Sequence, residues 1–191
     1  MARLSLPPLT TDRLRLEPVG EHHLPLLVEL NADPRVMRFV AGHAVPAEET
    51  AAEWDARLGA RTDATRGLGY WAGFAHDRFA GWWGASAYAG DPAVAVLGYR
   101  LRRAAWGAGL ATEGARAMVT RAFGAAGVER VAASTMAVNT GSRNVLAKVG
   151  LRHVRTWVQE WEDPIPGWEE GEVGYELTRA AWAARARRPL S

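Results

Sequence analysis

The feature that most constrains the fold of this 191-residue chain is a change of hydrophobic period near its middle. Ala93 to Leu101 reads as a strand, and Gly107 and Gly109 follow it. Leu110 to Phe123 then carries small and apolar side chains at helical spacing, and Val131 to Val138 reads as another strand. Parallel strands need a connection of helix length between them. The two strands are therefore expected to pair in parallel across the long helix.

The remaining segments alternate between strands, helices and polar turns, without a repeat, a low-complexity run or a linker. Turn residues at 76–78 and 90–92 separate three strands, which is typical of an antiparallel meander. Strands are expected at residues 13–17, 69–75, 79–88, 93–101, 131–138, 151–161 and 173–178, and helices at 21–31, 46–58, 110–123, 142–148 and the C-terminus. This order predicts an α/β (α+β) fold with a mixed, mostly antiparallel central sheet, helices on both faces and one domain over residues 1–191.

Composition and charge exclude several classes of protein. The formal net charge is only +2 and the arginines are scattered, which disfavours nucleic acid as a partner. The chain has no cysteine, so disulfides, thiolate metal sites and a cysteine nucleophile are ruled out, as suits a reducing cytoplasm. No apolar run has the length of a signal peptide or a membrane span. We therefore expect a soluble, cytoplasmic protein without a membrane partner, while a homodimer stays open.

The two glycines before the long helix favour an anion site. The first N–H groups of a helix have no acceptor within it, and together with the helix dipole they attract negative charge. Gly107 and Gly109 would let the backbone approach such an anion and adopt positive φ angles. A strand-to-helix turn capped by glycine, without a ligand, fits the same pattern.

Two polar residues, Asn139 and Ser142, follow the strand at 131–138. If that strand lies beside the strand at 93–101, their C-terminal ends converge near the glycine loop. The Asn139 amide and the Ser142 hydroxyl would then lie beside whatever the loop binds. Capping of the short helix by Asn139, Thr140 or Ser142 explains these residues equally well.

Four segments, in the same order, match one family. Tyr-Arg-Leu-(x)4-Trp-Gly-Ala-Gly-Leu-Ala-Thr-Glu from Tyr99 resembles the acyl-CoA loop of the GNAT superfamily of N-acetyltransferases, and looks most like its RimJ/RimL branch. The other segments are Thr11-Asp-Arg-Leu-Arg-Leu, Asn139-Thr-Gly-Ser-Arg-Asn-Val-Leu-Ala-Lys-Val-Gly-Leu and Tyr175-Glu-Leu-Thr-Arg-Ala-Ala-Trp. The resemblance covers the core of the domain, residues 9–182. It implies the GNAT fold and transfer of an acetyl group from acetyl-CoA to a primary amine, on a protein N-terminus or a small molecule.

The resemblance also implies CoA contacts by position. In the family, backbone groups of the strand before the loop pair with the pantetheine arm, and the loop amides hold the pyrophosphate. Trp106 stands where the general pattern has Gln or Arg, so nearby arginines such as Arg102 or Arg103 would supply the positive charge. The implied CoA-binding residues are Tyr99, Arg100, Leu101, Gly107, Ala108, Gly109, Leu110, Ala111, Thr112, Asn139 and Asn144.

Acetyl transfer needs a neutral attacking amine, stabilisation of the carbonyl oxygen and a proton for the leaving thiolate. Many relatives use a tyrosine seven residues after the asparagine as the acid, but Leu146 stands there. Ser142 matches the alternative acid of the RimJ/RimL branch and is the predicted catalytic residue. The family's glutamate positions fall at Val96 and near Ser134, so no base is identified. Either a carboxylate from elsewhere serves, or water removes the proton.

The expected acceptor site combines an aromatic wall with acidic residues. Trp82 and Trp83 are neighbours on a strand, so one is expected in the core and the other in an open groove. Acidic side chains gather between residues 160 and 172, and Glu169 and Glu170 are expected to attract a cationic amine. Two buried indoles and a solvated acidic loop are the plainer alternatives. The five histidines lack metal-ligand spacing, so no metal is expected.

Two other functions stay open at this point. The missing glutamate and tyrosine would also suit a non-catalytic acyl-CoA-binding or sensing module of the same fold. A nucleotide-phosphate-binding protein of another class is disfavoured, because no Lys-Ser/Thr follows the glycines and no acidic residue is placed for a ribose.

Overall fold

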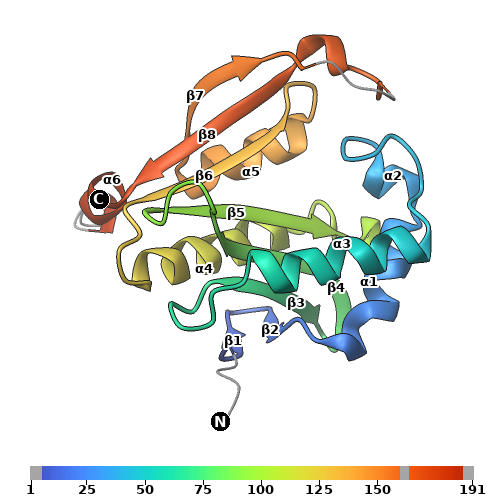
Figure 1. The fold of residues 1–191 in the computed structure, drawn as a ribbon, viewed down its shortest axis with the longest axis horizontal. Coiled ribbons are helices and arrows are strands. Elements are labelled where there is room, and N and C mark those ends of the chain that lie inside the picture. The colour runs from blue at the N-terminus through green and yellow to red at the C-terminus, as the bar shows by residue number, and fades with distance from the viewer. Residues whose placement is uncertain (1–5, 160–163, 187–191) are drawn as a thin grey trace.

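In the part of the chain that the structure describes, eight strands form one central sheet, in the order β1-β2-β3-β4-β5-β6-β8-β7 (Figure 1). The computed structural model describes residues 6–159 and 164–186. The strands are β1 (Leu9–Thr10), β2 (Arg15–Pro18), β3 (Gly69–Ala75), β4 (Arg78–Ala87), β5 (Val94–Leu101), β6 (Arg130–Met136), β7 (Arg152–Trp157) and β8 (Glu172–Thr178). The helices are α1 (Leu24–Asn31), α2 (Pro34–Met37), α3 (Ala47–Ala60), α4 (Leu110–Gly124), α5 (Thr140–Val149) and α6 (Arg179–Ala186), with 3-10 turns η1 (Glu21–His23), η2 (Arg103–Ala105) and η3 (Trp168–Glu170).

Among the strands that the structure describes, one neighbouring pair is parallel. β5 and β6 run parallel on either side of the α4 crossover, and every other neighbouring pair is antiparallel. The predicted meander is β3 to β5, and its first turn places His76 and Asp77 in the left-handed region, with φ angles of 48° and 59°. The mixed, mostly antiparallel sheet expected from the sequence is therefore confirmed.

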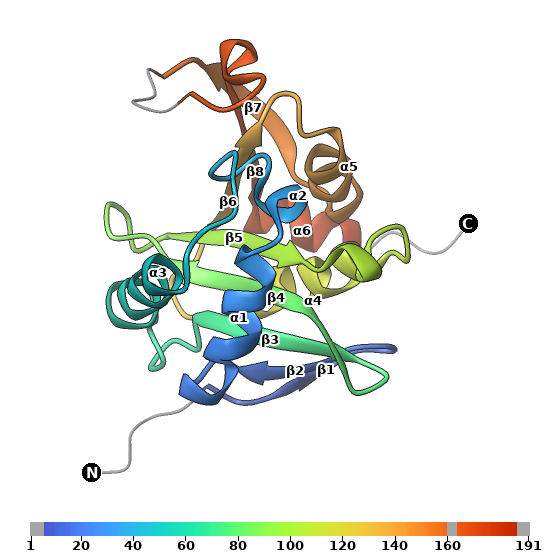
Figure 2. The same cartoon turned by 90° about the vertical axis from the view of Figure 1, so that its right-hand side faces the viewer.

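Helices cover both faces of the sheet (Figure 2). Each face has its own apolar core. α4 and α5 pack on one face, where Trp83, Met118 and Phe123 belong to the larger core. α1 and α3 pack on the other face over a smaller core that includes Leu27 and Trp54. Residues that alternate along the same strands contribute to the two cores. Each of these strands therefore has two differently packed faces.

The shortest strand and the shortest helix are not predicted by the sequence. β1 has two residues and α2 has four, and neither is long enough to show a period. α2 does carry a local start signal, since the Asp33 side chain accepts the Arg35 N–H and Pro34 stands at the first helical position. The expected strand at 151–161 ends at Trp157, and residues 160 and 161 lie outside the described part of the chain. Among the described residues, no helix has the length and apolarity that a membrane span requires.

Candidate active site

The opening between β5 and β6 is the central feature of the site. The two strands pair only where residues 94–96 face residues 130–132. Farther along, β5 stays paired with β4 up to Leu101, and β6 stays paired with β8 up to Met136. Residues 97–101 of β5 therefore have no strand partner, within the described part of the chain, on the side that faces β6. Such an unpaired edge can form backbone hydrogen bonds with an extended ligand.

Two loops meet across the same opening. Ile165, in the connection between β7 and β8, is only 3% exposed. A methyl group on Gly42, which follows α2, would lie 2.6 Å from Ile165 Cγ2. Gly42 and Ile165 therefore lie close together, and the loop after α2 approaches the segment before η3. The opening is thus bounded by the loop after α2 on one side and by the segment before η3 on the other.

The loop between β5 and α4 presents a row of unbonded backbone N–H groups. Gly107 and Gly109 have φ angles of 73° and 80°, in the left-handed region that favours glycine. The first bond of α4 runs from the Glu113 N–H to the Gly109 carbonyl at 3.1 Å. Within the described ranges, no acceptor takes the N–H groups of residues 107–112. An anion with several acceptor oxygens fits such a row at a helix N-terminus.

The arginine that reaches this loop is not one that the sequence singled out. Arg102 forms an ion pair with Glu29 on α1, and Arg103 lies in η2 on the same side. Arg13 instead donates a hydrogen bond from Nη1 to the Ala108 carbonyl at 2.7 Å. Arg13 belongs to the segment at residues 11–16 that carried part of the family resemblance, but no local spacing links it to the loop.

Ser142 lies in the first turn of α5 and meets Tyr99 across the opening. The Tyr99 hydroxyl oxygen is 3.0 Å from Ser142 Oγ and 3.2 Å from the Ser142 carbonyl oxygen. Asn139 Oδ1 accepts the Ser142 N–H at 3.1 Å, so Asn139 caps the helix and the Ser142 hydroxyl is not needed as the cap. Burial raises the pKa of Tyr99 to about 12, although the bond to Ser142 acts the other way, so the phenol keeps its proton at neutral pH.

The other residues of α5 are divided between core and solvent. Leu146, at the position of the tyrosine in many relatives, is 1% exposed and belongs to the core against α4. Asn144 is exposed. Contacts of Asn139 and Asn144 with CoA stay predictions.

The prediction that one of the paired tryptophans lines an open groove is wrong. Trp82 and Trp83 do point to opposite faces, but they are only 4% and 0% exposed. The Trp83 Nε1 donates to the Ala111 carbonyl at 3.2 Å. The Trp82 ring lies edge-on to Trp54 and Tyr70, with centroids 5.4 and 5.9 Å away. Helices cover both faces of the sheet at this point, which strand alternation alone cannot reveal.

A buried polar cluster beside Trp82 is absent from the sequence prediction. Arg100, 8% exposed, donates from Nη1 to Asn31 Oδ1 at 2.5 Å and lies 3.6 Å from Glu53. Glu53 also pairs with Arg57 at 2.6 Å and accepts from the Asn31 amide at 3.2 Å. Burial favours a higher pKa for Glu53, but the guanidinium groups of Arg100 and Arg57 bring its pKa below the ordinary value. The carboxylate is therefore ionised and joins α3 to β5.

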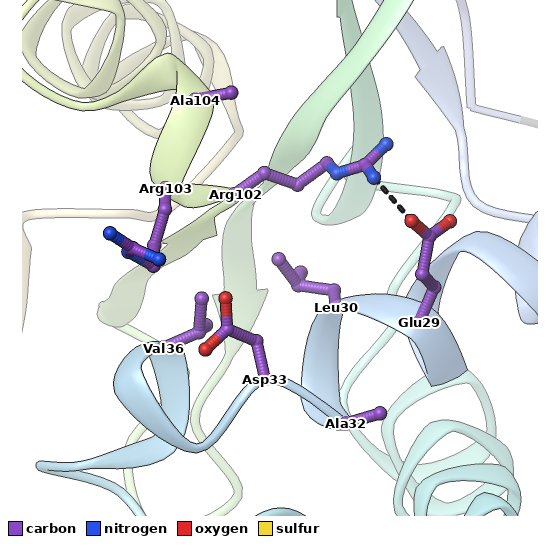
Figure 3. Close-up of a pocket in the computed structure, with 8 residues that line it drawn as sticks. All are labelled: Glu29, Leu30, Ala32, Asp33, Val36, Arg102, Arg103 and Ala104. Atoms are coloured by element: carbon purple, nitrogen blue, oxygen red, sulfur yellow. Dashed lines mark hydrogen bonds and ion pairs between the residues drawn. The ribbon is translucent and has the colours of Figure 1, made fainter.

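A cleft of about 600 Å³ lies between the α1–α2 corner and the end of β5 (Figure 3). Figure 3 shows the ion pair of Glu29 and Arg102 on one side of Leu30, and Asp33 and Arg103 on the other. The lining residues are Glu29, Leu30, Ala32, Asp33, Val36, Arg102, Arg103 and Ala104. The volume is within the range of small-molecule sites, and the lining offers charges of both signs around an apolar centre.

Carboxylates also gather on the β8 side of the opening. Glu172 begins β8, opposite Met136 at the end of β6, and accepts a hydrogen bond from Gln159 at 2.9 Å. Burial raises the pKa of Glu172. Glu169 and Glu170 lie in the η3 turn just before this strand and are exposed. Their attraction for an amine stays a prediction, and the acidic residues at 160, 162 and 163 lie outside the described residues.

A second group of titratable residues lies at the start of α1. Glu17, His22 and His23 place possible ligand atoms within 4.8 Å of one another. His23 Nδ1 accepts the Gly20 N–H at 3.1 Å, and its Nε2 is 3.3 Å from Glu17. Burial and the neighbouring His22 lower the pKa of His23 to about 4. The two ring nitrogens of His23 are thus both engaged, Nδ1 by the turn that begins the helix and Nε2 by Glu17 on β2.

Comparison with known proteins identifies the family. The sequence pattern of the acetyltransferase (GNAT) domain matches residues 13–152. The FsC-acetyl coenzyme A-N(2)-transacetylase of Aspergillus fumigatus is 38% identical over 186 residues, covering 92% of this chain and 78% of that protein. The chain belongs to the GNAT acetyltransferase family. The predicted class of reaction, N-acetyl transfer with acetyl-CoA as the donor, is confirmed.

Solved structures share the fold at lower sequence identity. RimL, a ribosomal L7/L12 alpha-N-protein acetyltransferase in complex with coenzyme A, matches with a TM-score of 0.74 and 18% identity, over 93% of this chain and 99% of that one. AAC(6')-Ib in complex with paromomycin and acetyl-CoA matches with a TM-score of 0.74 and 19% identity, over 94% and 100%. These likenesses confirm the predicted GNAT fold.

Proposed function

We propose that this enzyme acetylates the primary amine of a small molecule, with the donor lying in the opening between β5 and β6. The supporting observation is one continuous path from the unpaired edge at 97–101 to the unbonded N–H groups at 107–112. A pantetheine arm would pair with the strand edge, and a pyrophosphate would bind the loop. The thioester would then lie along this edge beside Tyr99, within reach of Ser142.

The transfer forms a C–N bond and breaks a C–S bond. The amine nitrogen attacks the thioester carbonyl carbon, and the thiolate that leaves takes a proton. Ser142 is the proposed proton donor, since its Oγ faces the opening next to Tyr99. If Tyr99 donates its own hydrogen bond to Ser142 Oγ, the serine proton is left free for the sulfur. Tyr99 thus acts as a positioning residue, and water returns the proton to Ser142.

The amine must also lose a proton as the C–N bond forms. Val96 and Ser134 cannot accept it, which leaves water as the first acceptor. Glu172 is the carboxylate that we propose receives the proton from water, because it lies at the β6–β8 side of the opening and burial raises its pKa. Glu172→Gln should remove the acidic limb of the pH profile of kcat/KM. A wild-type profile in this variant would leave water alone as the base.

The cleft lined by residues 29–36 and 102–104 is the proposed acceptor site. Its volume of about 600 Å³ suits a small molecule, and Asp33 and Glu29 can attract an ammonium group. The relative from Aspergillus fumigatus is named for transfer to an N(2) nitrogen, and AAC(6')-Ib was solved with paromomycin. RimL, by contrast, is named for a protein N-terminus. Such an acceptor needs a path for a whole chain, and we take the volume of the cleft to favour the smaller molecule.

One experiment tests the proposal directly. The enzyme is incubated with labelled acetyl-CoA and a mixed pool of small amines and peptide N-termini, and acetylated products are found by mass spectrometry. We expect small amines to be labelled and Ser142→Ala to lose most of the label. Labelling confined to peptides would overturn the acceptor class. CoA binding without any product would favour the alternative of a non-catalytic acyl-CoA-binding module.

A further inference from the structure

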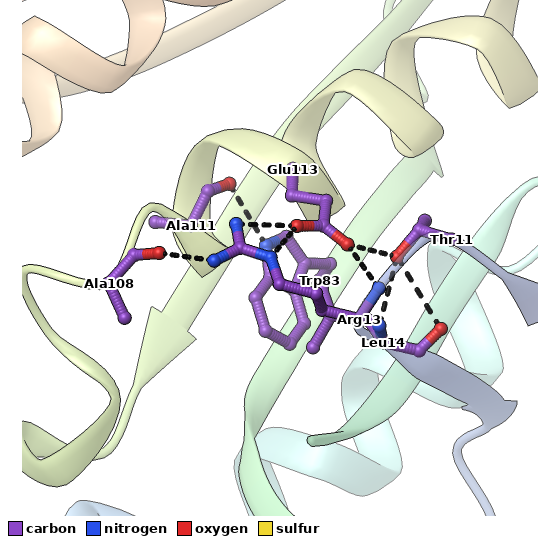
Figure 4. Close-up of polar contacts among 7 residues, drawn as sticks. All are labelled: Thr11, Arg13, Leu14, Trp83, Ala108, Ala111 and Glu113. Atoms are coloured by element: carbon purple, nitrogen blue, oxygen red, sulfur yellow. Dashed lines mark hydrogen bonds and ion pairs between the residues drawn. The ribbon is translucent and has the colours of Figure 1, made fainter. Parts of the chain in front are cut away.

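Three residues from two distant segments of the chain are joined by hydrogen bonds beside the loop between β5 and α4 (Figure 4). Glu113, in the first turn of α4, accepts from the Thr11 hydroxyl at 2.6 Å and from the Arg13 N–H at 2.8 Å. The other Glu113 oxygen accepts from Arg13 Nε at 2.7 Å and lies 2.6 Å from Nη2. Arg13 Nη1 donates to the Ala108 carbonyl at 2.7 Å. We call Thr11, Arg13 and Glu113 the loop clamp.

The bond to Ala108 fixes the direction in which the loop presents its N–H groups. A trans peptide is planar, so its carbonyl oxygen and its amide hydrogen point in opposite directions. Because Arg13 holds the Ala108 carbonyl, the Gly109 N–H must point away from the clamp. The N–H groups of residues 110–112 follow in the first helical turn, which Glu113 ties to the same arginine. One guanidinium therefore sets both the loop peptide and the helix that continues it.

The clamp also balances a charge that would oppose an anion. Burial tends to raise the pKa of Glu113, but hydrogen bonds from Thr11 and Arg13 bring its pKa below the ordinary value. The ionised carboxylate lies one residue beyond the row of free N–H groups, where it would repel a pyrophosphate. Arg13 neutralises it with a side chain that is 48% exposed. Arg13 thus brings a positive charge to a loop in which Trp106 occupies the position of Gln or Arg in the general family pattern.

We infer that Arg13 is a positioning residue for the phosphate end of the donor. It keeps the loop amides aimed at the pyrophosphate and cancels the charge of Glu113. Neither effect reaches the unpaired edge of β5 or the Ser142 hydroxyl. Loss of Arg13 should therefore weaken recognition of the phosphates while the pantetheine arm and the chemical step are unaffected. The inference depends on acetyl-CoA as the donor and not on the acceptor proposed above.

Two donors that differ only beyond the pantetheine arm provide the test. KM is measured for acetyl-CoA and for acetyl-pantetheine, which has no phosphate, and CoA affinity is measured by calorimetry. For Arg13→Ala we expect CoA binding and the KM of acetyl-CoA to weaken at least ten-fold, with the KM of acetyl-pantetheine within two-fold of wild type. Arg13→Lys should recover only part of the loss, because one ammonium cannot hold both Ala108 and Glu113. kcat at saturating donor should stay within two-fold in both variants.

Arg15→Ala is the matched control, since Arg15 lies two residues away and pairs with Glu17 and Asp77 instead of the loop. It should leave both donors unchanged. An equal loss with both donors, or an unchanged CoA affinity in a folded Arg13 variant, overturns the inference. If Arg13→Ala fails to fold, the Arg13→Lys variant carries the same test. Calorimetry with CoA needs no acceptor, so failure to find an acetylated amine would count against the proposed function alone.

Discussion

The two faces of the β4–β5 hairpin carry different parts of the site. On the α4 face, Trp83 and Tyr99 pack into or against the large apolar core, and the adjoining loop carries the unbonded backbone N–H groups that we propose bind the donor. On the α1 and α3 face, Trp82 and Arg100 belong to a group of aromatic and charged side chains. Among the described residues, the buried Nε1 atoms of Trp54 and Trp82 have no hydrogen-bond partner. This second face therefore contains buried polar groups that are hydrogen-bonded and others that are not.

Mutations on the two faces should therefore have different effects. A site made of backbone N–H groups depends on the φ angles of its loop and on the residue where its helix begins. Substitutions that change this backbone conformation should weaken binding and leave the fold intact. A site made of interlocking buried side chains depends on every partner, because a group left unpaired costs its full desolvation energy. Substitutions on the α4 face should therefore affect the donor first, and those on the α1 and α3 face should affect stability first.

The largest effect is expected from the polar face. Asn31 is fully buried and accepts the 2.5 Å hydrogen bond from Arg100. Asn31→Ala leaves the buried guanidinium with only the more distant Glu53, which should lower the free energy of unfolding by about 3 kcal/mol. Urea unfolding measures this loss, and Asn144→Ala, at an exposed site, should change stability by less than about 0.5 kcal/mol. A loss below about 1 kcal/mol for Asn31→Ala would mean that Arg100 is solvated and the two faces are alike.

The next effect concerns the chemical step on the other face. Ser142→Ala should lower kcat about 100-fold and leave the KM of acetyl-CoA nearly unchanged, because a proton donor acts in the transition state. Thr140→Ala removes an exposed hydroxyl from the same helical turn and serves as the control. Steady-state kinetics with a fixed amine measures both. Equal turnover in the two variants would leave Ser142 without a catalytic role, and the thiolate would take its proton from water.

Tyr99→Phe should have a smaller effect on the same step, of about ten-fold in kcat, because the phenol only orients Ser142. Since the pKa of Tyr99 is raised to about 12, the phenol stays protonated below that pH and loses its proton only above it. The kcat profile of the wild type should thus show no ionisation of Tyr99 between pH 6 and 10. A fall in kcat in that range that disappears in Tyr99→Phe would contradict this assignment.

The loop backbone gives the next prediction. Gly109 has a φ of 80° as the N-cap of α4, so Gly109→Val should weaken CoA binding at least ten-fold, about 1.4 kcal/mol. Gly127→Val tests the same strain elsewhere, because Gly127 has a φ of 75° and open space where a Cβ would stand. Calorimetry with CoA separates the two variants. Similar affinities in both folded proteins would show that the loop amides do not bind the phosphates.

Local patterns predicted the parts of the molecule that depend on local chemistry. The strand at 69–75, the helix that starts after Gly109 and the C-terminal glycine of α5, Gly150, all follow from periodicity and capping. The parallel pairing of β5 and β6 also followed, because a crossover helix allows few topologies. The family resemblance then added which atoms of this frame would meet the donor.

Contacts between distant segments could not be predicted in this way. Nothing near Arg13 indicates that it reaches Ala108, and nothing near Arg100 indicates that Asn31 lies opposite. The error at Trp82 has the same origin, since alternation gives the face of a side chain but not what covers that face. Burial of a polar or aromatic residue is decided by the helices that pack on the sheet, and their placement is a property of the whole fold.

The smallest effect is expected at the acidic turn beside the opening. Glu169 and Glu170 are exposed, and exposed charges act mainly through a field that salt screens over about 10 Å at 0.1 M ionic strength. Changing both to lysine should raise the KM of a cationic acceptor about three-fold at low salt and by much less at 0.5 M, with the KM of acetyl-CoA unchanged. Glu48→Lys with Asp55→Lys, at exposed positions on α3, gives the same change in net charge away from this turn. An equal rise in both double variants would reduce the effect to overall charge, and no rise in either would leave η3 as a solvated loop. A rise confined to the η3 variant would place the amine between this turn and the cleft, where side chains rather than backbone select the acceptor.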